Sequence, residues 1–275
     1  MEPNTDSDKI DSRLLDAGQQ YIDIHCHCLP GLDDGPATLA EALVLCRTLA
    51  DDGVKIVIAT PHQLGRFDGR NEPETIRNSV RKLNEQLQKE GIQLTVLPGA
   101  DIRIDERIPS LIKKHEILTL ADGGKYILLE LPHDIFIDPK SLLSELSSAG
   151  ITAIISHPER HRVLASQPLR VLKLLDAGAC LQITAASILG CFGPLAKKAS
   201  WYFLARGWAS IVASDAHDTK QRSPMMRAAF EKIRQKFGED LARLLVIENP
   251  SRVINGKTLE SLQLFEHREV YADEK

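Results

Sequence analysis

The chain has 275 residues, 43% of them hydrophobic, and a formal net charge of −4. A chain of this size buries a sizeable core, and a single α/β barrel uses about 250 residues. Acidic and basic residues are mixed along the chain, so no basic stripe indicates a nucleic-acid partner. No run approaches the roughly 18 apolar residues of a membrane span, and residues 1–20 do not resemble a signal peptide. We therefore predict a cytoplasmic protein.

Short β-branched runs alternate with longer amphipathic stretches, which is typical of βα units. Seven runs predict strands, at residues 21–27, 55–60, 93–97, 126–131, 151–156, 179–184 and 209–213. Six stretches predict helices, near residues 38–51, 73–90, 139–149, 168–177, 194–205 and 224–237. Several begin with proline, which suits a first helical turn, and a glycine follows five of them.

The regular order of helix, glycine and strand predicts right-handed crossovers that close a parallel α/β barrel of seven strands. A doubly wound open sheet is the alternative. We predict a flexible extension over residues 1–19, one barrel domain over residues 20–256 and a polar tail over residues 257–275.

Five of the nine histidines stand at or near the C-terminal ends of predicted strands, where barrel enzymes place their active sites. They are His25, His27, His62, His157 and His217. Taken singly, each is read more easily as a hydrogen-bonded structural residue. His25 and His27, however, are two residues apart on one strand and must point the same way. Two imidazoles side by side favour a metal site.

The cysteines fit a different role. Cys26 and Cys28 alternate with the two histidines, so we expect them to face the helices rather than to bind zinc. The chain has five cysteines, an odd number, and most lie in apolar strand or helix patterns. Reduced thiols explain this better than a disulfide framework, in agreement with the cytoplasm.

Carboxylates occupy matching positions near the strand ends. They are Asp23, Asp33, Asp34, Asp101, Glu130 and Asp215. Four protein ligands close a tetrahedral site, so a mixed nitrogen and oxygen set of this size suggests two or three metal ions. A solvated surface position remains the alternative for Asp23 and Asp33. It is a weak one for Glu130, which stands among leucines in an apolar strand, because an unpaired buried carboxylate is costly.

Five segments together carry a family resemblance: Asp23-Ile-His-Cys-His, Asp33-Asp34-Gly35, Thr60-Pro61-His62, His157-Pro158-Glu159-Arg160 and Ser214-Asp215-Ala216-His217. This set, in this order, resembles the polymerase and histidinol phosphatase (PHP) superfamily. Within it, the segments around Asp34 and His157 resemble the bacterial tyrosine-protein phosphatases of capsule and exopolysaccharide operons. The resemblance covers about residues 20–256.

The resemblance implies a distorted seven-stranded barrel with three divalent metal ions, most often manganese, with zinc or iron as alternatives. It implies a first ion held by His25, His27, Asp101, Glu130 and Asp215. Asp101 or Glu130 would bridge to a second ion, which His157 also holds. Asp34, His62 and His217 would hold the third.

The chain departs from the family pattern at two places. After Pro-Gly the pattern offers a glutamate, whereas this chain has Ala100-Asp101, and an aspartate is one methylene shorter as a bridge. Either the backbone moves inward or the metal is held more weakly. The family branch also starts within a few residues of its first histidine pair, which leaves the extension of about 20 residues unexplained.

Hydrolysis of a phosphate ester needs a nucleophile at neutral pH and compensation for charge on the phosphate oxygens, and metal ions supply both. Arg160 and Arg222 are candidates for the remaining charge, because a guanidinium matches phosphate geometry bidentately. The resemblance assigns phosphate binding to both, and surface arginines are the alternative. Together with Asp215 and His217 they are the predicted catalytic residues. A phenol with a pKa of about 10 leaves readily, so no general acid is assigned.

Other hydrolase chemistries lack their signatures. No cysteine is followed six positions later by arginine, and neither a Gly-x-Ser-x-Gly elbow nor a Walker phosphate loop occurs. Three hypotheses remain: a phosphatase acting on a tyrosine kinase of polysaccharide export, a small-molecule phosphatase of the histidinol-phosphate type, and a non-catalytic module that binds phosphotyrosine or a kinase. The pair Asp33 and Asp34 favours the first. The loop at residues 63–71 is read equally as a rim for a peptide or as an ordinary surface loop. The oligomeric state stays open.

Overall fold

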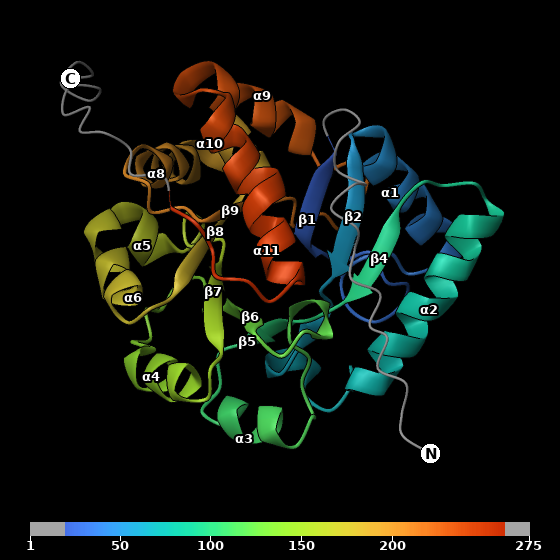
Figure 1. Cartoon of the computed structure of the whole chain (residues 1–275), viewed down its shortest axis with the longest axis horizontal. Helices are drawn as coiled ribbons and strands as arrows, with labels where there is room; N and C mark the ends of the chain where they lie inside the picture. The colour runs from blue at the N-terminus through green and yellow to red at the C-terminus, as the bar shows by residue number, and fades with distance from the viewer. Residues whose placement is uncertain (1–19, 262–275) are drawn as a thin grey trace.

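The computed structural model of the chain describes residues 20–261, so the predicted extension at residues 1–19 and most of the predicted tail lie outside the described residues. Figure 1 shows the elements. The strands are β1 (Tyr21–Cys26), β2 (Val54–Ala59), β3 (His62–Gln63), β4 (Thr95–Pro98), β5 (Asp101–Arg103), β6 (Tyr126–Glu130), β7 (Thr152–Ser156), β8 (Cys180–Thr184) and β9 (Ile211–Ala213). The longer helices are α1 (Leu39–Asp51), α2 (Pro73–Lys89), α4 (Lys140–Ser148), α8 (Gly193–Ala205) and α9 (Met226–Phe237). The shorter ones are η2 (Gly65–Phe67), α3 (Ile108–Lys113), η3 (Leu120–Asp122), α5 (Arg162–Ser166), η4 (Pro168–Val171), α6 (Leu172–Asp176), α7 (Ala185–Leu189), α10 (Glu239–Arg243), η5 (Leu244–Glu248) and α11 (Asn249–Ile254).

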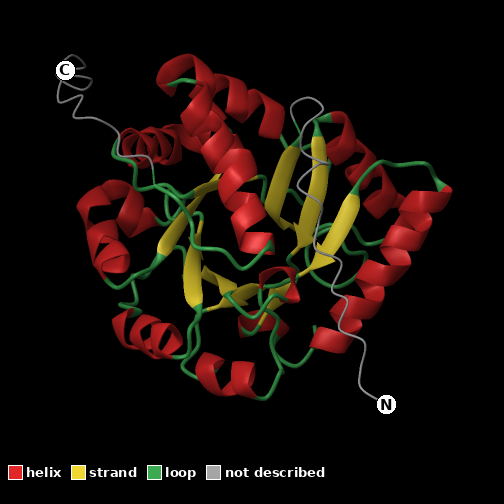
Figure 2. Cartoon of the chain, in the orientation of Figure 1, coloured by secondary structure: helices red, strands yellow, loops and turns green. Residues whose placement is uncertain are grey.

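The strands form two parallel sheets, ordered β1-β2-β4 and β3-β5-β6-β7-β8-β9 within the described residues. The order follows the chain, without the reversal of a doubly wound sheet, so the open-sheet alternative receives no support. An isolated parallel bridge between Cys26 and Ala216 joins the end of β1 to the segment after β9. In Figure 2 the strands lie inside and the helices surround them. The α/β class with parallel strands is confirmed.

Each predicted run contains a strand, but the structure has two further short strands, β3 and β5, just beyond the second and third predicted runs. Pro61 separates β2 from β3, and Gly99 separates β4 from β5. A Cβ on Gly99 would lie 2.6 Å from the side chain of Ile58, so the backbone needs glycine for this close approach. Beyond the two breaks, His62 and Asp101 are register partners in the six-stranded sheet. The breaks therefore set two predicted ligands side by side.

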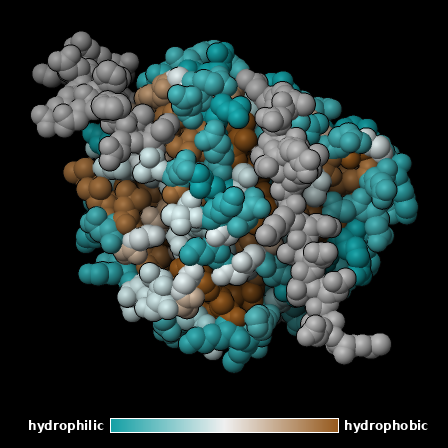
Figure 3. All heavy atoms as spheres, in the orientation of Figure 1, coloured by the Kyte–Doolittle hydropathy of each residue, from teal (hydrophilic) through white to brown (hydrophobic). Residues whose placement is uncertain are grey.

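The hydrophobic core has an inner and an outer layer. Alternate strand residues such as Ile24, Leu128 and Ile154 cluster inside the ring of strands, where Val253 of α11 packs against them. The opposite strand faces, including Val57 and the buried faces of the helices, form the outer layer. Figure 3 shows hydrophilic residues over much of one face of the molecule, as expected for amphipathic helices that turn their apolar side inward.

Helix α1 illustrates why the surrounding helices form where they do. Thr38 and Glu41 make a capping box that satisfies backbone N–H groups of the first turn. Ala42, Leu45 and Leu49 are buried at helical spacing. None of the helices within residues 20–261 combines the length and the apolar composition needed to cross a membrane.

Candidate metal centre

The nine predicted metal ligands meet at one end of the molecule, where the C-terminal ends of the parallel strands converge. Four groups of histidine and carboxylate side chains have ligand atoms within 4.8 Å of one another. The groups are His27, Asp34, His62 and His217; His25, His27 and Asp101; His25, His157 and Asp215; and His62, Asp101 and Glu130. Among residues 20–261 these groups contain all nine predicted ligands and no other residue. Residues from six different strand ends thus form one cluster.

His25 of β1 and His27, which directly follows this strand, point to the same place, as strand alternation predicts. Their Nε2 atoms are 3.2 Å apart. Strand β1 has a register shift between Asp23 and Cys26, which lets His25 reach the cluster although Ile24 before it packs in the inner core. Cys26 packs in the outer layer, as does Cys28. The expectation that these cysteines face the helices is correct.

In both histidines the Nδ1 atom, on the side of the ring away from the other histidine, forms a hydrogen bond. His25 Nδ1 donates to Gln182 Oε1 at 2.9 Å, and His27 Nδ1 donates to Asp33 Oδ2 at 2.6 Å. Each neutral ring therefore presents its Nε2 lone pair to the other. Two lone pairs at this separation repel unless a cation lies between them. A carboxylate or amide behind a ligating histidine is the usual arrangement of metal sites.

Asp33 is not the solvated residue that the sequence left open. Its side chain is buried, and besides His27 it accepts hydrogen bonds from the backbone N–H groups of His62 (3.1 Å) and Gly35 (3.0 Å). Its neighbour Asp34 is the one whose carboxylate reaches the cluster. Gln182 of β8 carried no sequence signal, because an isolated glutamine in an apolar strand resembles any buried polar residue.

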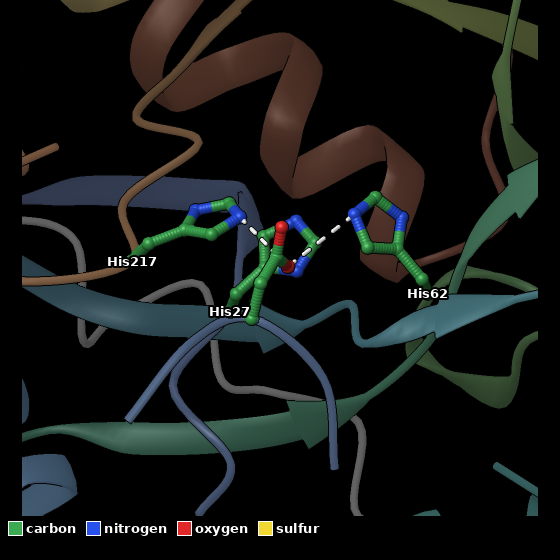
Figure 4. A group of neighbouring side chains, drawn as sticks. His27, His62 and His217 are labelled. Atoms are coloured by element: carbon green, nitrogen blue, oxygen red, sulfur yellow. Dashed lines mark ion pairs between the residues drawn. The ribbon is translucent and has the colours of Figure 1, made fainter. Parts of the chain in front are cut away.

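One part of the centre is shown in Figure 4, where the rings of His27, His62 and His217 converge from three separate segments. Asp34 Oδ1 lies 3.3 Å from Nε2 of His217 and 3.5 Å from Nε2 of His62. The Asp34 side chain is 38% exposed, so this side of the centre is open to solvent.

Asp101 is one of the most buried members of the cluster. It is fully buried, and neither of its carboxylate oxygens has a hydrogen-bond donor. Its Oδ2 is 3.4 Å from His62 Nδ1 and 3.7 Å from His25 Nε2. A buried carboxylate without donors is costly unless a cation compensates it. The shorter side chain still belongs to two of the four groups, as a bridging ligand must.

Glu130 ends β6 beside Asp101. Its Oε2 lies 3.8 Å from His62 Nδ1 and its Oε1 lies 3.9 Å from His157 Nε2. Arg103, which the sequence did not single out, contacts Glu130 Oε2 at 3.0 Å. Glu130 therefore joins the His62 side of the centre to the His157 side.

Asp215 contacts both histidine and arginine side chains of the centre. Its Oδ1 is 3.2 Å from His25 Nε2, and Arg222 donates to its Oδ2 at 2.7 Å. Arg160 also pairs with this carboxylate, and its guanidinium lies over the Phe192 ring. Burial alone would raise the pKa of Asp215, but the charges of its basic neighbours hold this pKa well below its usual range. Both predicted phosphate-binding arginines thus face the centre rather than solvent.

The protonation states that burial favours at the centre suit the binding of cations. Burial lowers the pKa of His25 to about 4, so the ring is neutral at pH 7 and its lone pair is available. Burial lowers the pKa of His62 to about 4 as well. Burial and the charges of Glu130 and Asp215 raise the pKa of Asp101 well above its usual range. Neutral nitrogen ligands beside crowded carboxylates fit divalent ions.

We expect Mn²⁺ binding to release protons. The raised pKa means that Asp101 carries a proton below that pKa, and a cation that binds its oxygens must displace this proton. Affinity should therefore rise with pH. Calorimetry in two buffers of different ionisation enthalpy measures the release, and Asp101→Asn should release fewer protons per ion. Equal binding enthalpies in both buffers, with an affinity constant from pH 6 to 8, would contradict the expectation.

A cavity of ≈ 290 Å³ opens beside the centre. The loop at residues 63–71 forms part of its wall: the Phe67 ring stacks on His62 with centroids 5.5 Å apart, and Arg66 donates to Asp34 Oδ2 at 2.7 Å. Two larger cavities adjoin it. One, of ≈ 470 Å³, shares Leu64 and Phe67 with it, and the other, of ≈ 510 Å³, includes Asp34 and His217. The loop is therefore a rim of the site.

The family model of capsular polysaccharide synthesis proteins, CpsB/CapC, matches residues 21–255. The tyrosine-protein phosphatase YwqE of Bacillus subtilis (strain 168) is 36% identical to this chain over 239 residues, which cover 86% of the chain and 93% of that protein. The tyrosine-protein phosphatase CpsB of Streptococcus pneumoniae is 31% identical over 240 residues, with 85% of this chain and 98% of that protein covered.

Solved structures agree. The chain is similar to a crystal structure from work on YwqE from Bacillus subtilis and CpsB from Streptococcus pneumoniae, described as unique metal-dependent tyrosine phosphatases. The TM-score is 0.84 at 35% identity, over 88% of this chain and 97% of that chain. A variant organophosphorus hydrolase from Deinococcus radiodurans matches with a TM-score of 0.57 at 14% identity, over 87% and 94% of the two chains, which supports the fold alone. With its family model and these relatives spanning nearly all of the described residues, the chain belongs to the CpsB/CapC family of capsular polysaccharide synthesis.

Proposed function

We propose that the chain is a metal-dependent protein-tyrosine phosphatase that hydrolyses phosphotyrosine in a partner protein. The observation that carries this proposal is the single cluster of nine histidine and carboxylate ligands with two arginines on its edge. The names of the relatives, which are tyrosine-protein phosphatases, support it independently.

The proposed ligand roles follow the family. His25, His27, Asp101, Glu130 and Asp215 surround a first divalent ion. His157, with Asp101 or Glu130, would hold a second ion, and Asp34, His62 and His217 would hold a third. Manganese is the proposed metal, with zinc and iron as alternatives. When bound, such ions supply a water of lowered pKa as nucleophile and offset charge on the phosphate. We also propose that the two sheets act as one distorted seven-stranded barrel around this centre.

The residues of the chain contribute in separate ways. Arg160 and Arg222 bind phosphate oxygens, because both guanidinium groups already meet a carboxylate oxygen at the centre and a phosphate oxygen offers the same geometry. Asp215 keeps them oriented, and His217 lies on the solvent-open side beside Asp34. A tyrosine phenol with a pKa of about 10 leaves without a strong general acid.

The cavities favour a polypeptide substrate over a small molecule. A histidinol-phosphate-type phosphatase needs to enclose one small ligand, whereas here one larger cavity includes Asp34 and His217 of the centre and another adjoins the cavity beside His62 through Leu64 and Phe67. A chain that continues in both directions from a phosphotyrosine can occupy them. The proposed partner is a tyrosine autokinase of capsular or extracellular polysaccharide export, dephosphorylated in the cytoplasm by the barrel domain at residues 20–256.

Replacing Phe67 with alanine should raise KM for a tyrosine-phosphorylated peptide about two- to tenfold, since aromatic contacts contribute about 0.5–1.5 kcal/mol. The ring stacks on His62 at the cavity wall, where it can meet the substrate phenyl group. Steady-state kinetics measure the effect. Phe237→Ala, which removes a ring packed on Trp201 instead, is the matched control. An unchanged KM in Phe67→Ala would remove the loop from the proposed peptide site.

The test of the function compares two substrates. Protein loaded with Mn²⁺ is given a tyrosine-phosphorylated peptide and, separately, histidinol phosphate, with His157→Ala as the inactive control. A higher kcat/KM for the peptide, lost in the control, supports the proposal. Preference for histidinol phosphate would move the protein to small-molecule metabolism. Inactivity with Mn²⁺, Zn²⁺ and Fe²⁺, combined with binding of the phosphopeptide, would favour the non-catalytic module.

A further inference from the structure

Asp23 belongs to the motif that begins the metal centre, yet none of the four ligand groups includes it. Its side chain is fully buried on β1, which rules out the solvated surface position that the sequence left open. It lies two residues before His25, with Ile22 and Ile24 on either side in the inner core. A buried carboxylate here must have another use, because burying it without partners is costly.

All hydrogen bonds of the Asp23 side chain are with residues of two segments that contain predicted metal ligands. Oδ1 accepts from the backbone N–H of Ser214 at 3.0 Å and from that of His25 at 3.2 Å. Oδ2 accepts from the Ser214 hydroxyl at 2.5 Å. Ser214 is 191 positions away in the chain, so these bonds join the first strand to the loop after β9. That loop carries Asp215 and His217.

The Ser214 loop has a conformation that needs support. Asp215 has a φ of 51°, in the left-handed region that residues with a Cβ seldom adopt. The Ser214 hydroxyl also accepts from the Ala216 N–H at 3.0 Å, so it spans the strained residue. On the other side, the Asp215 N–H donates to the His25 carbonyl at 2.8 Å. Asp23 and Ser214 therefore brace the turn from behind, while the Asp215 carboxylate faces the centre.

We propose that Asp23 is a positioning residue that, through Ser214, fixes Asp215 against His25 and so sets the affinity of the centre for its divalent ion. The inference rests on the proposed function only in taking the centre as a metal site. A carboxylate suits this position because it accepts on both oxygens. Asparagine would turn an NH₂ group toward one of the same donors.

The geometry predicts a specific set of variants. Asp23→Asn and Ser214→Ala should each weaken Mn²⁺ binding about 10- to 100-fold, the usual effect of losing a partner behind a metal ligand. Ser214→Thr keeps the hydroxyl and should retain near-native affinity. Ser200→Ala is the matched control, since Ser200 is also fully buried but bonds only to Ala196 within α8.

The experiment measures Mn²⁺ affinity by calorimetry and the visible absorption of the Co²⁺-loaded protein, with thermal unfolding recorded for each variant. We expect Asp23→Asn and Ser214→Ala to lose affinity and alter the Co²⁺ spectrum, with kcat recovering as Mn²⁺ is raised. Ser200→Ala should keep the native affinity and spectrum even if its melting temperature falls.

Folded Asp23→Asn and Ser214→Ala proteins with native affinity and spectrum would overturn the positioning role while leaving the phosphatase proposal intact. A native chain that binds neither ion would overturn both. If Asp23→Asn does not fold, the comparison of Ser214→Ala with Ser214→Thr decides, because threonine restores the hydroxyl and alanine does not.

Discussion

Removal of bound divalent cations should reduce hydrolysis of a tyrosine-phosphorylated peptide by at least about a thousandfold. Metal ions at such sites supply several kcal/mol of transition-state stabilisation, and about 1.4 kcal/mol corresponds to a factor of ten in rate. The described residues offer no cysteine nucleophile in place of the metal ions. None of the five cysteines is followed six positions later by the arginine that a cysteine phosphatase needs, and three of them are buried. The five strand-end histidines, together with Asp34, Asp101, Glu130 and Asp215, all belong to the metal cluster.

The measurement uses protein dialysed against a chelator, with metal content checked by atomic emission and activity followed as Mn²⁺ is returned. Circular dichroism before and after dialysis separates loss of metal from loss of fold. Recovery on addition of Mn²⁺ to a folded, metal-free protein is the expected result. Retention of more than a tenth of the activity without metal would contradict the metal-dependent chemistry.

Asp215→Asn should lower kcat for the same peptide by about a thousandfold. The carboxylate lies 3.2 Å from His25 and pairs with both Arg160 and Arg222. Asparagine keeps the shape but removes the charge. It therefore weakens a ligand and leaves two guanidinium groups without their shared partner, at a cost of several kcal/mol for a buried charge pair.

Asp176→Asn is the matched control, because Asp176 ends α6 on the surface and belongs to none of the metal groups. It should keep native kcat and metal content. Steady-state kinetics at saturating Mn²⁺, together with metal analysis of each variant, make the comparison. A decrease of less than tenfold in Asp215→Asn with full metal occupancy would exclude Asp215 as a ligand and as the anchor of the arginines.

The strands and the histidines and carboxylates at their ends could be predicted from the sequence, because both follow from local patterns. A β-branched run predicts a strand, and in parallel strands the C-terminal ends meet at one edge, so histidines there had to come together. All seven predicted strand runs contain strands, and the nine predicted ligands lie in one cluster. The spacing of His25 and His27 alone placed both rings on one face.

The last helices of the chain could not be predicted from such patterns. Residues 239–254 form α10, η5 and α11, yet Leu244–Ile247 are buried on every side and show no amphipathic period. Asn249-Pro250, read locally, resembles a turn. In the fold, Pro250 occupies the first turn of α11, whose Val253 packs into the inner core. Burial by the rest of the molecule, not local periodicity, makes this segment helical.

The sequence by itself determined the parallel α/β fold and the histidines and carboxylates at the strand ends, since each depends on residues close together in the chain. Only the tertiary structure decided which residues form hydrogen bonds and ion pairs with these histidines and carboxylates. These contacts are hydrogen bonds and ion pairs: His27 with Asp33, His25 with Gln182, Ser214 with Asp23, and Arg160 and Arg222 with Asp215. Most of them join segments far apart in sequence. Such long-range contacts produce no periodic pattern in the sequence, so they could not be predicted from it.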